Sequence, residues 1–139
     1  MMKTHLSPGT GALLGWAFAL LVGSLLVAPS ASAQIARKFP ADALRGALAV
    51  TNPPQATLNG APARLAPGAR IRGPNNLFVL SGSVVGQRLL VHYTLDTQGL
   101  VKDVWILTPD EAAKRPWPTT PKEAASWEFD ASAQTWTRK

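Results

Sequence analysis

Hydrophobic positions in the second half of the chain mostly follow the two-residue period of β-strands. Leu89, Val91, Tyr93 and Leu95 alternate with other residues over 88–95, and Val104 and Ile106 keep the same period over 100–108. Residues 96–99 place Asp at the start of a turn and Gly at its left-handed end. The pattern predicts a long hairpin at the centre of a sheet.

A second hairpin is predicted where 56–58 and 61–65 flank Asn59-Gly60, a dipeptide that readily adopts the two positive φ angles of a tight turn. A turn at Pro67-Gly68 then leads into 69–72, where Ile71 takes one face and two arginines take the other. After a further turn at 73–76, residues 77–80 are apolar on both faces, which favours a short buried strand.

A helix is predicted in the segment 34–50. Its evidence is the helical spacing of Ala43, Leu44, Ala47 and Leu48, which follow Pro40 and Asp42. The prolines at 53 and 54 end this predicted helix.

Two similar segments begin at Thr108 and Thr120, and each has Pro next and Glu three residues after the Thr. This is the pattern of a capping box, so two short helical turns are predicted. Strand-like alternation in 127–130 and 135–137 predicts a last small hairpin or a loosely ordered end.

The expected fold is therefore α+β and mainly β. It comprises a small antiparallel sheet or partly open barrel, an N-terminal helix and short C-terminal helical turns. Residues 34–54 are assigned to the helix and a proline-rich linker, and 55–139 to the β-rich domain.

The first 33 residues are typical of a cleavable signal peptide. Lys3 precedes an apolar run over 12–28, then come Pro29 and the small-x-small triplet Ala31-Ser32-Ala33. Cleavage after Ala33 predicts a periplasmic or secreted protein, and the alternative is an uncleaved anchor in the inner membrane, which needs about 20 apolar residues.

The amino-acid composition limits which anchors, cross-links and partners this protein can have. The chain has no cysteine, which excludes a lipid anchor at the cut site and any disulfide. Cleavage leaves 106 of 139 residues, enough for one domain. The net charge of +6 favours anionic partners, and in this compartment it points to an envelope protein, a cell-wall polymer or an anionic lipid surface; nucleic acid is not expected.

Catalytic chemistry has few candidate residues. After cleavage, His92 is the one histidine, so no His/Cys metal site and no cofactor is expected. If Leu95 faces Leu100 across the turn, His92 faces Asp103 in an acid/base couple. The serines that such a histidine would activate are Ser81, Ser83, Ser126 and Ser132. A cross-strand His/Asp pair also serves as plain structure.

Binding has more candidates. Four arginines on strands are predicted to share one polar face of the sheet and to meet carboxylates or phosphates: Arg64, Arg70, Arg72 and Arg88. Trp105, Trp117, Trp127 and Trp136 enlarge the core of a small domain. Trp117 lies between Pro116 and Pro118, which favours a rigid exposed ring that docks a partner.

The alternation over 88–108, with Asp96 and Gly99 in its turn, resembles the first hairpin of the C-terminal domain of TonB-type energy-transducing proteins. The resemblance implies a periplasmic module that contacts outer-membrane transporters, with the hairpin followed by a helix and a strand. As a whole, the chain resembles small uncharacterised exported proteins of Gram-negative bacteria.

These observations predict a non-enzymatic envelope module that binds an anionic or protein partner. Two alternatives stay open: a small envelope hydrolase that uses His92 with a carboxylate, and a structural protein or a dimer formed through an exposed sheet edge.

Overall fold

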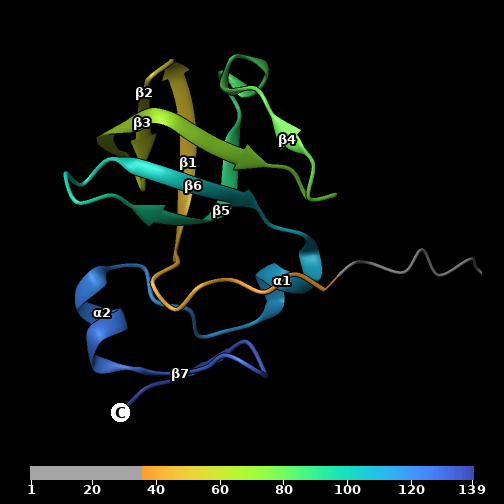
Figure 1. Ribbon diagram of the computed structural model, residues 1–139, viewed down its shortest axis with the longest axis vertical. Helices are drawn as coiled ribbons and strands as arrows, with labels where there is room; N and C mark the ends of the chain where they lie inside the picture. The colour runs from red at the N-terminus through yellow and green to blue at the C-terminus, as the bar shows by residue number, and fades with distance from the viewer. Residues whose placement is uncertain (1–35) are drawn as a thin grey trace, which may run out of the picture. The chain divides into compact units, whose positions relative to one another are not determined.

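Six strands pair into one mixed sheet that closes on itself (Figure 1). The structure is a computed structural model that describes residues 36–139, so the predicted signal peptide lies outside the described residues. The strands of the sheet are β1 (Leu44–Asn52), β2 (Gln55–Leu58), β3 (Ala61–Arg72), β4 (Phe78–Val79), β5 (Arg88–Leu95) and β6 (Val101–Ile106).

The strand order is β2-β1-β5-β6-β3-β4, and an additional β2–β3 pairing joins the first strand to the fifth. Five strands therefore form a barrel, with β4 as a short extension beside β3. All pairs are antiparallel except β3 and β6. This small Greek-key barrel has the ring order of the OB-fold class. The expectation of a mainly β fold is confirmed.

Both predicted hairpins are formed, and interactions within a few residues shape their turns. Asn59 and Gly60 have φ of +53° and +83°, and they join β2 to β3. Asp96 accepts backbone hydrogen bonds from Gln98 and Leu100 at 2.8 and 2.9 Å, which shapes the turn between β5 and β6. As predicted, these two strands lie at the centre of the strand order.

The predicted N-terminal helix is wrong, because residues 44–52 form β1. Leu44, Leu48 and Val50 are buried with the two-residue period of a strand, whereas alanines between them imitate helical spacing. Pairing with β2 on one side and β5 on the other satisfies the backbone groups of β1. The segment assigned to a helix and linker is thus part of the barrel wall.

Two smaller expectations also fail. No turn ends the strand at Pro67-Gly68; instead β3 runs through both residues, and its register against β6 shifts between Leu65 and Arg70. The positive φ of Gly68, +76°, fits such an irregularity. Residues 77–80 do contain the strand β4, but it lies at the edge of the sheet, where Phe78 is exposed and Val79 is half-buried.

The barrel interior is filled by aliphatic side chains from all five of its strands. The buried members are Leu44, Leu48, Val50, Ala56, Leu65, Ile71, Val84, Val91, Tyr93, Val101 and Val104. A 3-10 helix (Ser81–Val84) supplies Val84. On β5, residues 91–94 are buried on both faces, so something must cover the outside of the barrel there.

The cover is a second layer built from residues 36–43 and the C-terminal segment. It contains α1 (Pro109–Ala113), α2 (Pro121–Ser126) and the hairpin of β7 (Glu128–Asp130) and β8 (Thr135–Thr137) (Figure 1). Its buried core combines Phe39, Ala43, Leu107, Trp117 and Trp136.

Both predicted helix starts are confirmed, but only the first has the complete capping box. The Thr108 hydroxyl accepts from the Glu111 backbone, and the Glu111 carboxylate accepts from the Thr108 backbone at 2.9 Å. Thr120 caps α2 in the same way, but Glu123 reaches back to Thr119. The predicted terminal hairpin is confirmed as β7 and β8.

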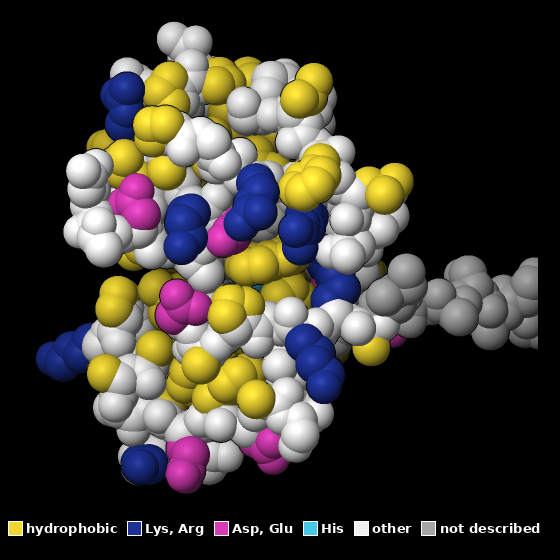
Figure 2. All heavy atoms as spheres, viewed as in Figure 1, with side chains coloured by type: hydrophobic (Ala, Val, Ile, Leu, Met, Phe, Trp, Pro, Cys, Tyr) yellow, Lys and Arg dark blue, Asp and Glu magenta, His cyan; other side chains and the backbone are white. Residues whose placement is uncertain are grey.

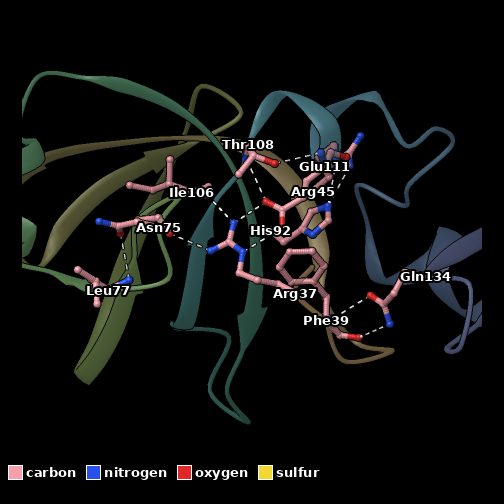
Figure 3. Close-up of polar contacts among 11 residues, drawn as sticks. Arg37, Phe39, Arg45, Asn75, Leu77, His92, Ile106, Thr108, Glu111 and Gln134 are labelled. Carbon is pink, nitrogen blue, oxygen red and sulfur yellow. Dashed lines mark hydrogen bonds and ion pairs between the residues drawn. The ribbon is translucent and has the colours of Figure 1, made fainter. Parts of the chain in front are cut away.

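The buried ion pair of Arg37 with Glu111 lies within the second layer, and further hydrogen bonds of Arg37 join that layer to the barrel. Arg37 binds the Glu111 carboxylate through Nε and Nη2, and its Nη1 and Nη2 also donate to the carbonyls of Gly73 and Ile106, both at 2.8 Å (Figure 3). The two side chains are 5% and 13% exposed. Burial alone raises the pKa of Glu111, but the hydrogen bonds from Arg37 and Thr108 outweigh it and lower that pKa.

Arg37→Met is expected to lower the free energy of unfolding by about 3 kcal/mol, because it leaves the Glu111 carboxylate buried without its counter-charge. The matched control is Arg70→Met, which removes an ion pair with Asp103 whose arginine is 59% exposed, and it should cost less than about 1 kcal/mol. Urea unfolding measures both. Equal losses would show that Arg37 does not hold the layers together.

Candidate functional site

The most unusual polar contact of the protein lies between the barrel and the layer that covers it. Arg45 of β1 and His92 of β5 are register partners on adjacent strands. Their neighbours Leu44, Val91 and Tyr93 belong to the barrel core, so Arg45 and His92 lie on the outer side of the barrel wall. Both are nevertheless buried, because the C-terminal layer covers them.

Arg45 donates to His92 from two nitrogens (Figure 3). Nε and Nη2 lie 3.2 and 3.1 Å from His92 Nε2. A guanidinium has no acceptor, so Nε2 accepts and the ring proton resides on Nδ1. His92 Nδ1 is buried without a hydrogen-bond partner among the described residues.

The remaining N–H groups of Arg45 bind the end of α1. Nη1 donates to the carbonyls of Ala112 and Lys114 at 3.1 and 2.9 Å, and Nη2 donates to the carbonyl of Glu111 at 2.9 Å. The carbonyls of Ala112 and Lys114 are among those that a helix C-terminus leaves unpaired, whereas the Glu111 carbonyl also accepts from the Lys114 backbone. Arg45 is thus fully hydrogen-bonded, yet no carboxylate among the described residues forms an ion pair with it.

His92 is enclosed by aromatic rings and is held neutral. It stacks on Trp117 with ring centroids 4.0 Å apart, and Phe39 meets it edge to face at 4.4 Å. Burial, and then repulsion from Arg45 and Arg37, lowers the pKa of His92 from 6.5 to about 2. With 1% of its surface exposed, His92 has no contact with a substrate in solution.

The predicted couple of His92 with Asp103 is not formed. The strand register places His92 opposite Trp105, because the pairing shifts between Tyr93 and Leu95 near the turn. Asp103 instead accepts a hydrogen bond from Arg70 at 3.2 Å and lies next to Thr94. Counting residues outward from the turn assumes regular strand pairing, so it misses such a shift in the register.

None of the candidate nucleophiles is hydrogen-bonded to His92, since Nε2 binds Arg45 and Nδ1 has no partner in 36–139. Ser83, Ser126 and Ser132 donate within their own turns, to Leu80, Glu123 and Asp130. Ser81 begins the 3-10 helix.

The expected exposed ring of Trp117 is wrong as well. Trp117 is 5% exposed, and its Nε1 donates to the Ala43 carbonyl at 2.9 Å. Trp136 is also buried, while Trp105 and Trp127 are half-buried against the same cluster. The flanking prolines hold Trp117 against His92 instead of presenting it to solvent.

The four predicted binding arginines do not form one site. Arg70 and Arg72 lie near each other on the part of β3 that pairs with β6, whereas Arg64 lies opposite Gln55 of β2. Arg88 lies opposite Ala49 of β1. The cavities of about 460, 420 and 260 Å³ within residues 36–139 are lined by other residues.

A different set of arginines does converge. The cavity of about 460 Å³ is lined by Arg45, Arg115, Pro116, Trp117 and Arg138, with no acidic side chain in its lining. The guanidinium of Arg45 lies 5.6 Å from the Trp117 ring centroid, and that of Arg138 lies 5.0 Å from the Trp127 ring centroid. We call this cavity the arginine pocket.

Like charges repel within the arginine pocket. Burial is the main cause that lowers the pKa of Arg45, repulsion from Arg115 adds to it, and attraction to Glu111 partly offsets both. Arg115 and Arg138 make no hydrogen bond or ion pair with the residues that the structure describes. The pocket therefore presents positive charge and unused N–H donors together.

No pattern in the sequence predicts this pocket. The spacing around Arg45 predicts a helix, and Arg115 and Arg138 lie in the C-terminal segment, where the predicted binding residue is Trp117. Arg115 directly precedes Pro116-Trp117, and this adjacency is the one local signal that could have pointed to it.

The described residues show no candidate metal site and no membrane-spanning helix. Residues 36–139 contain no group of three or more His, Asp or Glu side chains placed to hold a metal ion. Within the same range, no helix is long and apolar enough to cross a bilayer.

Comparison with protein-family models, curated proteins and solved structures finds no match for this chain. The resemblance to the TonB hairpin therefore stays a prediction.

The buried His92 predicts a specific loss of stability in acid. In the folded protein, His92 stays neutral down to about pH 2, whereas in the unfolded chain it becomes protonated near pH 6.5. Its stabilising contribution is thus complete above about pH 6.5 and is lost as the pH falls. Between pH 7 and pH 5 the loss should reach about 2 kcal/mol.

His92→Gln tests this, because glutamine keeps an acceptor for Arg45 and does not titrate. Urea unfolding at pH 7 and pH 5 should show a clearly smaller decline for the variant than for the native protein. An identical decline in both would mean that His92 is not the group responsible.

Proposed function

We propose that the protein is an exported, non-enzymatic binding module that captures an anionic group of an envelope partner in the arginine pocket. The observation that carries this proposal is the convergence of three arginines, Arg45, Arg115 and Arg138, on one cavity without an acidic side chain. Gathering like charges costs free energy in the unoccupied protein, and an anion removes that cost.

The three arginines have different tasks in this proposal. Arg45 is saturated by carbonyls and His92, so it contributes a fixed positive field and no donors. Arg115 and Arg138 have free guanidinium groups that bind carboxylate or phosphate oxygens through paired hydrogen bonds. Pro116 and Trp117 form an apolar wall on which water is displaced, which strengthens these contacts.

Binding is favoured over hydrolysis by the same lining. The pocket holds no carboxylate, imidazole or hydroxyl group to act as a base or nucleophile. His92 lies behind Trp117 and is neutral, and its one acceptor nitrogen is already used by Arg45. Because His92 is neutral, it does not add a second positive charge beside Arg45.

Titration of the purified protein with pyrophosphate and with citrate tests the pocket. These probes carry several anionic oxygens at distances that two guanidiniums can span. In isothermal titration calorimetry, Arg115→Ala with Arg138→Ala should weaken binding at least about tenfold, because two charge-assisted contacts are lost.

The matched control is Arg64→Ala with Arg88→Ala, which removes the same charge from the barrel strands and should change the affinity less than about twofold. Equal weakening by both pairs would indicate non-specific attraction. The absence of binding of both probes to the native protein would also overturn the proposal.

Export is tested on its own. We expect the protein that accumulates in cells to begin at Gln34 by intact-mass measurement, since the Ala31-Ser32-Ala33 triplet fits signal peptidase. Ala33→Arg should block cleavage and increase the mass by that of the retained segment. A native protein that retains Met1 would contradict the proposed processing and favour an anchored form.

A further inference from the structure

The edge of the sheet at β4 exposes large apolar side chains. Leu77, Phe78 and Leu80 are 65%, 67% and 82% exposed, and Val85 beyond the 3-10 helix is 43% exposed. We call these four residues the apolar rim. Figure 2 shows hydrophobic side chains protruding on the side where β4 lies, next to Lys and Arg side chains. Exposed apolar groups concentrated in this way indicate a contact surface.

The sequence of the strands around the apolar rim is rich in arginine and poor in acidic residues. Between Asp42 and Asp96 the sequence contains no Asp or Glu, and its charged residues there are all arginines: Arg45, Arg64, Arg70, Arg72 and Arg88. Arg72 is the register partner of Phe78, and its guanidinium lies 5.0 Å from that ring centroid. Arg70 is on the same strand and is largely exposed, but it forms an ion pair with Asp103, so Arg72 is the arginine beside the rim that has no acidic partner within residues 36–139. An anionic surface would complement this arrangement.

An apolar cavity adjoins the rim. A volume of about 260 Å³ opens at this end of the barrel, and its lining includes Pro54, Leu65, Ile71, Val79 and Leu80 and no charged residue. Leu80 belongs to both the cavity and the rim. Apolar groups inserted from outside would thus find further apolar contacts beneath the surface.

Two features disfavour a second copy of the chain as the occupant. Strand β4 has only two residues, which gives little backbone to pair with another strand. A two-fold contact through the rim would also bring Arg72 of both copies together, and Arg72 forms no ion pair within residues 36–139. A lipid surface needs no strand pairing and supplies the missing negative charge.

We propose that the apolar rim docks the protein onto an anionic lipid surface. Phe78 and the leucines enter the boundary between headgroups and acyl chains, while Arg72 binds lipid phosphates at the same depth. This inference is independent of the arginine pocket, since the two surfaces share no residue.

Vesicle co-sedimentation tests the proposal with the protein in the form that accumulates in cells. The probes are vesicles of phosphatidylglycerol with phosphatidylethanolamine, and vesicles of phosphatidylcholine alone. Phe78→Ser with Leu80→Ser should lower partitioning onto the anionic vesicles at least about tenfold, because two inserted apolar side chains are lost. Arg72→Gln should lower it severalfold, and it should remove most of the preference over phosphatidylcholine.

Leu90→Ser is the matched control, because Leu90 is 44% exposed but lies on β5, outside the rim, and it should leave partitioning unchanged. Since all variants share one N-terminal segment, any contribution from that segment cancels. The absence of cysteine from the chain permits a second readout from a single environment-sensitive dye. Attached at Leu77→Cys, it should brighten and shift to the blue on anionic vesicles, and attached at Ala133→Cys it should not.

Three outcomes would overturn the proposal: equal partitioning of the serine variant and the native protein, a dye response of equal size at both positions, or binding that ignores lipid charge. Light scattering adds a fourth. If the native protein is a dimer that Phe78→Ser with Leu80→Ser converts to a monomer, the rim is a contact between copies and not a lipid surface.

Discussion

Two arginine side chains withdrawn from water hold the C-terminal layer on the barrel, and most of the structure depends on how their N–H groups are satisfied. Arg37 has a full counter-charge in Glu111, the residue that also closes the capping box of α1. Arg45 has none, and it is stabilised by carbonyls at the end of the same helix and by His92. The five-residue helix α1 thus binds one arginine through the Glu111 carboxylate and another through the carbonyls at its C-terminus. Packing against the barrel stabilises such a short helix where its intrinsic propensity would not.

The candidate site follows from this arrangement. Because His92 is buried and the nearby Arg45 and Arg37 repel a further positive charge, it stays neutral, and the only imidazole in the described residues becomes an acceptor for a guanidinium. The chemistry that a lone histidine first suggests is thereby replaced by an electrostatic role. Arg115 and Arg138 extend the positive charge to the surface. A positive field with free donors is suited to holding an anion, and the lining lacks the groups needed to transform one.

Charge is also distributed unevenly along the chain, with consequences for both proposed surfaces. All acidic residues lie at Asp42 or from Asp96 onward, so the strands β1 to β5 contribute only positive charge. The apolar rim lies in this acid-free part, whereas the arginine pocket draws two of its three arginines from the acid-containing segment. We therefore propose distinct contacts for the two surfaces, one with a discrete anionic group and one with an extended anionic interface.

Sequence alone determined the elements whose geometry is decided within a few residues. Asn59-Gly60 and the loop of Asp96 to Gly99 fixed two hairpins through local dihedral preferences, and the two Thr-Pro segments fixed helix starts through side-chain caps. Tertiary structure decided the rest. Alanine-rich β1 became a strand because partners on both sides satisfied its backbone, and Trp117 was buried because a second layer had to cover β5. The pocket joins Arg45 to residues far along the chain, at 115 and beyond. Such convergence depends on barrel closure and strand register, and no local pattern encodes either.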